Sequence, residues 1–85
     1  MNKALNKDYI RWHLQEAAEE IEKLIAEIDN DPEWEIGGFT VGMGHIFHHC
    51  NSAWNARYAT EKEAEDCSEA DFVRWRQYPT DLPVK

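Results

Sequence analysis

The sequence predicts an all-α protein: an antiparallel helical hairpin plus a short C-terminal helix, with two copies dimerising into a four-helix bundle. Three observations predict this fold. A heptad pattern of apolar residues occupies the first third of the chain, a second apolar segment carries no charge, and a helix-capping signal precedes the last aromatic residues. Eighty-five residues suffice for one domain, in which a single core gives only marginal stability. Residues 1–85 are therefore expected to form a single helical domain.

The first helix is expected over residues 7–29. Asn6 is a suitable N-cap, and Asp8 places a favourable negative charge in the first turn. Pro32 disfavours helical geometry at the residue before it, so the helix should end close to that point. The apolar residues are spaced alternately by four and three positions, which is the spacing of a heptad seam: Ile10, Leu14, Ala17, Ile21, Leu24 and Ile28.

Residues 30–38 are expected to connect this helix to a second one over residues 39–59. From Ile36 to Ala56 the chain contains no Asp, Glu, Lys or Arg, although 31% of all residues are charged. A helix with one face in water normally carries charges on that face. We therefore expect protein to cover most of the second helix, and its polar groups to find partners inside. Those polar groups are His45, His48, His49, Asn51, Ser52 and Asn55.

The C-terminal part is expected to contain a short helix over residues 68–77 and an extended tail over residues 78–85. Ser68, followed three positions later by Asp71, is an N-cap signal. One short helix cannot readily cover both sides of the second helix. The preferred solution is a homodimer in which the second helices become central and their His/Asn/Ser side forms the dimer seam. The alternative is that the C-terminal segment folds back over the second helix within one chain.

Composition excludes several classes of partner. The net charge is −8 and no basic stripe is present, so nucleic-acid binding is not expected. The histidines and asparagines of the charge-free segment would be costly in hydrocarbon, so no membrane span is expected. Two cysteines make no disulfide framework, and the N-terminus lacks the apolar core of a secretory signal. The expected location is the cytoplasm.

Three histidines are candidate metal ligands. His45 and His49 are four residues apart on one helical face, so both imidazoles could reach one ion. His13 on the first helix, or a carboxylate near it, would supply a third ligand for zinc or another divalent transition metal. Position 46 is Ile, so the His-Glu-x-x-His signature of zinc proteases is absent. The competing interpretation is that these histidines form hydrogen bonds across a helix interface.

A nucleophilic site is less favoured. Ser52 lies one turn beyond His48, but amide groups in the middle of a helix are already bonded and cannot stabilise an oxyanion. The aromatic and arginine-rich run over residues 72–78 is either a patch for a protein partner or part of the core. The sequence therefore predicts a non-catalytic homodimeric binding or regulatory module without a cofactor. The alternative is a divalent-metal-binding helical bundle, with a possible enzymatic role, that uses His45, His49 and His13.

Overall fold

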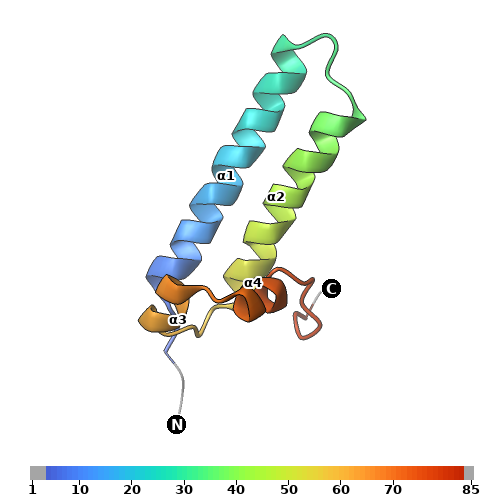
Figure 1. Cartoon of the computed structure of the whole chain (residues 1–85). Coiled ribbons are helices and arrows are strands. Elements are labelled where there is room, and N and C mark those ends of the chain that lie inside the picture. Colours follow the sequence, from blue (N-terminus) through green and yellow to red (C-terminus); the bar gives the residue numbers. More distant parts are fainter. Residues whose placement is uncertain (1–3, 84–85) are drawn as a thin grey trace.

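The computed structural model describes residues 4–83, which form helices and connections without a strand in that range. The helices are α1 (Lys7–Asn30), α2 (Ile36–Asn55), α3 (Glu61–Asp66) and α4 (Glu69–Trp75). In Figure 1, α1 and α2 lie side by side, and α3 and α4 lie at the end of the pair where α1 begins and α2 ends. The prediction of an all-α fold is confirmed.

The start of α1 is anchored to the segment that follows α2. The side-chain oxygen of Asn6 accepts a hydrogen bond of 3.0 Å from the backbone N–H of Tyr9, which is the capping role expected from the sequence. The Asn6 side-chain amide donates to the carbonyl of Ala59 at 2.9 Å, and its backbone N–H donates to the carbonyl of Arg57 at 2.7 Å. One residue thus caps α1 and holds the chain that leaves α2.

The second helix is displaced towards the N-terminus relative to the expected residues 39–59. It begins at Ile36 and includes both members of the Gly37-Gly38 pair. The connection is correspondingly shorter than the expected residues 30–38, and its Trp34 donates a side-chain hydrogen bond of 3.2 Å to Glu27 of α1. At the other end, the N–H of Arg57 bonds to the carbonyl only three residues back. This tighter turn ends the α-helix at Asn55.

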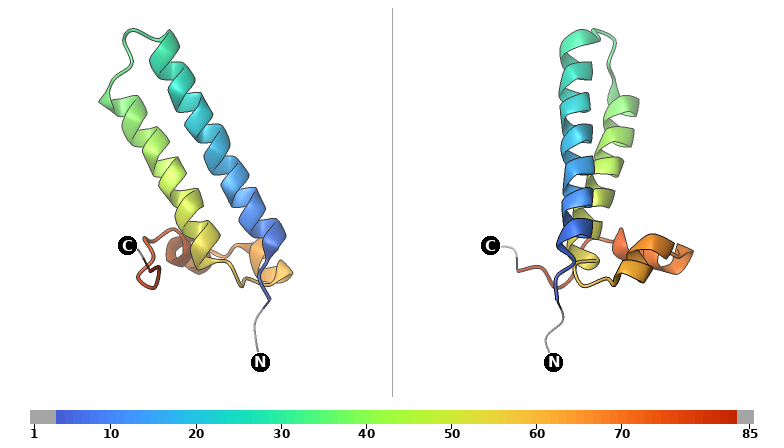
Figure 2. Two further views of the ribbon diagram at one scale, coloured as in Figure 1. Left: turned by 180° about the vertical axis from the view of Figure 1, so that it is seen from behind. Right: turned by 90° about the vertical axis from the view of Figure 1, so that its left-hand side faces the viewer.

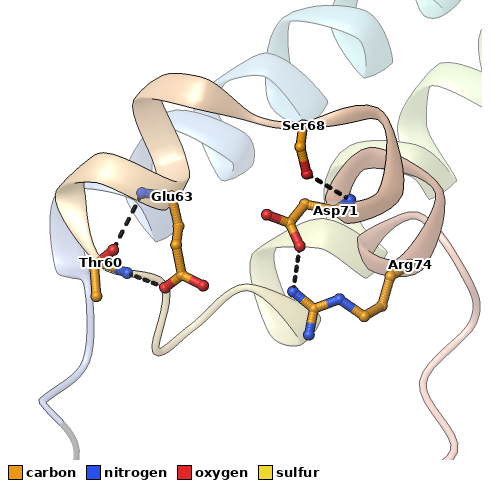
Figure 3. A network of polar contacts seen from close by, with 5 residues as sticks. All are labelled: Thr60, Glu63, Ser68, Asp71 and Arg74. Carbon is orange, nitrogen blue, oxygen red and sulfur yellow. Dashed lines mark hydrogen bonds and ion pairs between the residues drawn. The ribbon is translucent and has the colours of Figure 1, made fainter.

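Two short, separately capped helices follow, of which the sequence analysis predicted only the second. The Thr60 hydroxyl accepts from the backbone N–H of Glu63, whose carboxylate accepts in return from the N–H of Thr60 (Figure 3). This capping box starts α3. The Ser68 hydroxyl accepts from the N–H of Asp71 at 3.1 Å and starts α4, which ends at Trp75 rather than at 77 (Figure 3).

The polar side of α2 is covered by the C-terminal segment of the same chain. The Asn55 side-chain amide donates to the carbonyls of Trp75 at 2.8 Å and Gln77 at 2.7 Å. The Asn51 amide donates to the carbonyl of Arg76 at 3.0 Å. Asn51 and Asn55 are thus bonded within the chain, as in the alternative in which the C-terminal segment folds back over the second helix, and the dimer seam expected on the His/Asn/Ser side stays a prediction. The carbonyls at the end of α4 have no further helical partners, and the asparagine amides of α2 satisfy them instead.

The contact between α1 and α2 is built on small residues. Gly42 lies against Leu24, so closely that a Cβ atom at position 42 would overlap the leucine side chain. Ala17 of α1 and Ala53 of α2 are also buried. Small side chains let the two helices approach, which makes Gly42 useful in spite of its low helix propensity. No helix in the described part of the chain has the length and apolar character needed to cross a membrane.

Much of the apolar surface of the helix pair is left uncovered within the chain. The right-hand view of Figure 2 shows α3 and α4 projecting from one side of the pair, while the segment after α4 crosses to the other side only at the lower end. The apolar residues that form the opposite side are all exposed except Met43, which is half-buried. We call this surface the open apolar face, and it consists of Leu14, Ala18, Ile21, Ile25 and Ile28 on α1 with Phe39, Met43 and Cys50 on α2.

Candidate functional site

A cavity of about 340 Å³ lies where α3 and α4 meet the helix pair. Its α1 wall is formed by Tyr9, Trp12 and His13, and its α2 wall by His48 and Ser52. The remaining wall comes from the C-terminal part of the chain: Ala64, Cys67, Phe72 and Trp75. All four helices thus contribute to one pocket, together with Cys67 between α3 and α4. Most of the side chains that line it are aromatic or apolar.

His13 and His49 form a direct contact beside this cavity. Their Nδ1 atoms are 3.0 Å apart, so one Nδ1 donates a proton and the other accepts it, and the two rings adopt complementary tautomers. His13 is only 3% exposed. Burial, reinforced by the neighbouring His49 and His48, lowers the pKa of His13 to about 4. The contact is therefore a hydrogen bond between neutral rings at neutral pH.

His48 and His49 of the charge-free segment have different surroundings. Burial lowers the pKa of His48, and His49 and Arg76 lower it further. Burial also lowers the pKa of His49, but the carboxylates of Glu16 and Glu20 oppose this effect. The cluster near the cavity is thus electrically neutral at pH 7, because a charged imidazole would lose much of its hydration there.

The structure brings together two of the three predicted metal ligands. His13 and His49 are in contact, whereas the exposed His45 directs its Nδ1 at a carboxylate oxygen of Glu20, 3.1 Å away. Within residues 4–83 no group of three or more His, Cys, Asp or Glu side chains is arranged to hold a metal ion. The metal site formed by His13, His45 and His49 therefore stays a prediction.

Three buried polar atoms in this region have no hydrogen-bond partner within residues 4–83: His13 Nε2, His48 Nδ1 and Ser52 Oγ. All three belong to residues that line the cavity. Ser52 and His48 are one turn apart on α2, but the Ser52 hydroxyl has no hydrogen-bond partner within residues 4–83 and so does not bond to His48. Such a hydroxyl is not activated as a nucleophile, because no base lies within hydrogen-bond reach.

Sequence reasoning missed the rest of the pocket, above all Tyr9, Trp12 and Cys67. Trp12 and His13 follow Tyr9 by three and four positions, so a helix places all three on one side. Burial raises the pKa of Tyr9 to about 12, helped by Cys67 and Asp71, so its hydroxyl stays protonated. Cys67 has a φ of 36°, a left-handed conformation that is uncommon outside glycine.

No protein-family model, no curated protein and no solved structure matches this chain significantly. The cavity offers aromatic surface and a small number of neutral hydrogen-bonding groups, which is the composition of a small-molecule site more than of a catalytic one.

Proposed function

We propose that the protein is a non-catalytic homodimeric binding or regulatory module in which two copies pair through the open apolar face. The observation that carries the proposal is the exposure of this face. Leu14 is 51% exposed, Ile25 54% and Ile28 52%, and all three belong to the α1 part of the open apolar face. Contiguous apolar surface of this kind on a small protein marks an interaction site.

The positions of the two seams favour a second copy as the partner. On α1 the residues of the open apolar face lie about 80° around the helix from Ala17 and Leu24, which face α2, at 100° per residue. On α2 the seam of Phe39, Met43 and Cys50 lies about 80° in the same rotational sense from Gly42 and Ala53. The two helices run in opposite directions (Figure 1), so equal rotations in the same sense bring both sets of residues to one side of the pair.

The size of this side suits a dimer. Two helices of this length, packed at the usual spacing, present a whole side of roughly 700 Å² per copy, and the open apolar face takes up part of it. A standard stable interface takes about 800 Å² per partner. Two such faces packed together would place four helices around one apolar core, which is the bundle expected from the sequence.

Cys50 and Cys67 are both free thiols, which agrees with a reducing, cytoplasmic location.

The decisive experiment compares two glutamate substitutions in sedimentation velocity. Ile25→Glu places a charge in the centre of the open apolar face and is expected to convert the dimer to a monomer with unchanged helical circular dichroism. Val41→Glu is the matched control, because Val41 is a β-branched residue that is 60% exposed but lies on the other side of α2. This control is expected to sediment as the dimer.

Two outcomes would contradict the proposal. One is an unsubstituted protein that sediments as a monomer at concentrations of about 100 µM, far above the dissociation constant of a standard interface. The other is a dimer that survives Ile25→Glu but is lost in Val41→Glu, which would place the interface on the other side. Replacing His49 or Ala56 with glutamate would not test the dimer interface. His49 bonds to His13 and Ala56 is buried within one chain, so either change would act on the fold of the single chain.

A second candidate function is divalent-metal binding through His13, His49 and His45. The observation in its favour is the 3.0 Å separation of the His13 and His49 nitrogens, close to the roughly 3.4 Å between two imidazole ligands of a tetrahedral zinc ion. His45 would have to exchange its bond to Glu20 for the metal. Native mass spectrometry of protein purified without a tag tests this. One zinc per chain, lost in the His13→Ala, His49→Ala double variant, would support it, and metal-free protein after zinc addition would refute it.

A further inference from the structure

The cavity contains a set of hydrogen-bonding atoms that the protein itself leaves unused. His13 is 3% exposed and Ser52 is 1% exposed, so bulk water does not satisfy them. His13 Nε2, His48 Nδ1 and Ser52 Oγ all lack a partner within the described residues. A buried polar atom without a hydrogen bond destabilises a fold, and native proteins contain few of them. Three around one cavity indicate a partner that binds there.

The chemistry of these atoms selects an uncharged partner. The Ser52 hydroxyl can donate or accept, and each imidazole nitrogen donates or accepts according to its tautomer. Among the described residues that line the cavity none is Asp, Glu, Lys or Arg, and the 3.0 Å contact between the Nδ1 atoms of His13 and His49 requires one of the two to be unprotonated. The raised pKa of Tyr9 keeps its hydroxyl protonated. A ligand with a full charge would leave its hydration shell without meeting an opposite charge among these groups.

The walls of the cavity select a flat, apolar body for the ligand. The Tyr9 ring meets the Trp75 ring edge to face, with centroids 5.9 Å apart, and lies parallel to the Trp12 ring at 6.1 Å. The His48 and Phe72 rings are 4.9 Å apart. The members of each pair contact each other, so a ligand ring would lie against these aromatic surfaces, in offset-stacked or edge-to-face contact, and not between the two members of a pair. The volume of about 340 Å³ falls in the range of small-molecule pockets.

We propose that this cavity binds a small, uncharged aromatic molecule with a hydroxyl or ring N–H group, whose polar group bonds to Ser52 and to His13 or His48. The site goes beyond the pairing of two copies. It lies on the side of the helix pair that carries α3 and α4, since Ala64, Phe72 and Trp75 line it, whereas the helical positions of the open apolar face put that face on the other side. Failure of either proposal therefore leaves the other standing.

The test uses four simple probes with the full chain: phenol, indole, toluene and benzoate. Binding is followed by the backbone amide shifts in ¹⁵N–¹H NMR. Phenol and indole are expected to bind saturably with dissociation constants of about a millimolar or lower, as suits fragments of this size. The shifts should concentrate at residues such as Ser52, Ala64 and Trp75. The far end of the pair, at Ile28 and Gly37, should remain unaffected.

Two variants separate the polar and the steric parts of the site. Ser52→Ala should weaken phenol binding by about three- to tenfold and leave toluene binding unchanged, because only the hydroxyl contact is lost. It should not destabilise the fold, since the hydroxyl has no partner without ligand. Ala64→Leu fills the cavity and should weaken every probe by at least about tenfold. Ala70→Leu is its control, because Ala70 is exposed on α4 and does not line the cavity.

Several results would overturn the inference. Linear, non-saturating shifts for phenol and indole would mean that the cavity takes only water. Benzoate binding as tightly as phenol would contradict the selection of an uncharged ligand. Phenol binding that is unchanged in the folded Ala64→Leu variant would place the bound molecule outside this cavity.

Discussion

The Nδ1 atoms of His13 and His49 lie 3.0 Å apart, although the residues are 36 positions apart in the sequence. This hydrogen bond joins α1 to α2 beside the cavity. Each ring limits the tautomer of the other, and His13 Nε2 is left free towards the cavity region. The packing of the helix pair and the chemistry of the candidate site therefore depend on the same pair of residues.

The stability of the fold is expected to fall as the pH decreases from about 6.5 to about 4. The pKa of His13 is lowered from 6.5 to about 4 in the folded chain, where it faces His49 and His48 of α2. Between these values the unfolded chain binds a proton that the folded chain does not, so acid favours unfolding. The shift corresponds to at most about 3 kcal/mol. His48 and His49, whose pKa values are also lowered, act in the same direction.

Urea unfolding at several pH values measures this effect. His13→Gln is the control, because glutamine does not titrate and its stability should vary less over the same interval. Equal pH dependence in the two proteins would show that other groups, such as the many carboxylates, dominate the acid response.

Two glycines of α2 are expected to respond in opposite ways to alanine. Gly42→Ala should destabilise the fold by about 1–3 kcal/mol, because the new Cβ would overlap Leu24 and force the helices apart. Gly44→Ala should stabilise it by up to about 1 kcal/mol, since nothing lies near that position and alanine favours a helix. Thermal unfolding followed by circular dichroism measures both. A stabilising Gly42→Ala would mean that α1 and α2 are not packed as closely as described.

Asn55 is expected to contribute more than Asn51 to holding the C-terminal segment. The Asn55 amide donates to two carbonyls, those of Trp75 and Gln77, whereas the Asn51 amide donates to one. Asn55→Ala should cost about 2 kcal/mol and Asn51→Ala about 1 kcal/mol. Hydrogen exchange of the α4 amides, compared with those of α1, reports the local effect. Equal protection of α4 in both variants would contradict this division.

Each helix boundary could be predicted to the extent that the residues that determine it lie close together in the sequence. The capping role of Asn6 and the end of α1 before Pro32 depend on residues within a few positions, and the sequence predicted both. α2 starts three residues earlier than expected, because Gly37 and Gly38, which lie in the expected connection over residues 30–38, are helical. The capping box of Thr60 and Glu63 was present in the sequence but was overlooked, so α3 was missed.

The candidate site was predictable only in part. The four-residue spacing of His45 and His49 on one helix predicted them as metal ligands, with His13 of the first helix as the third. Spacing along one helix does not determine which residue of another helix comes opposite. His49 thus meets His13, while His45 turns to Glu20. The cavity needs Cys67, Phe72 and Trp75 from the C-terminal segment, and no local pattern predicts where that segment returns.

The sequence by itself determined the class of the fold and the location of its main helices, because apolar periodicity and capping act over one or two turns. The tertiary structure decided what each helix face contacts. The asparagines of α2 bond to the end of α4 rather than to a second copy, and the heptad seam of α1 divides into a part that meets α2 and a part that stays open. The physical reason is that periodicity assigns a residue to a face, whereas the partner of that face depends on close packing and on hydrogen bonds between distant segments.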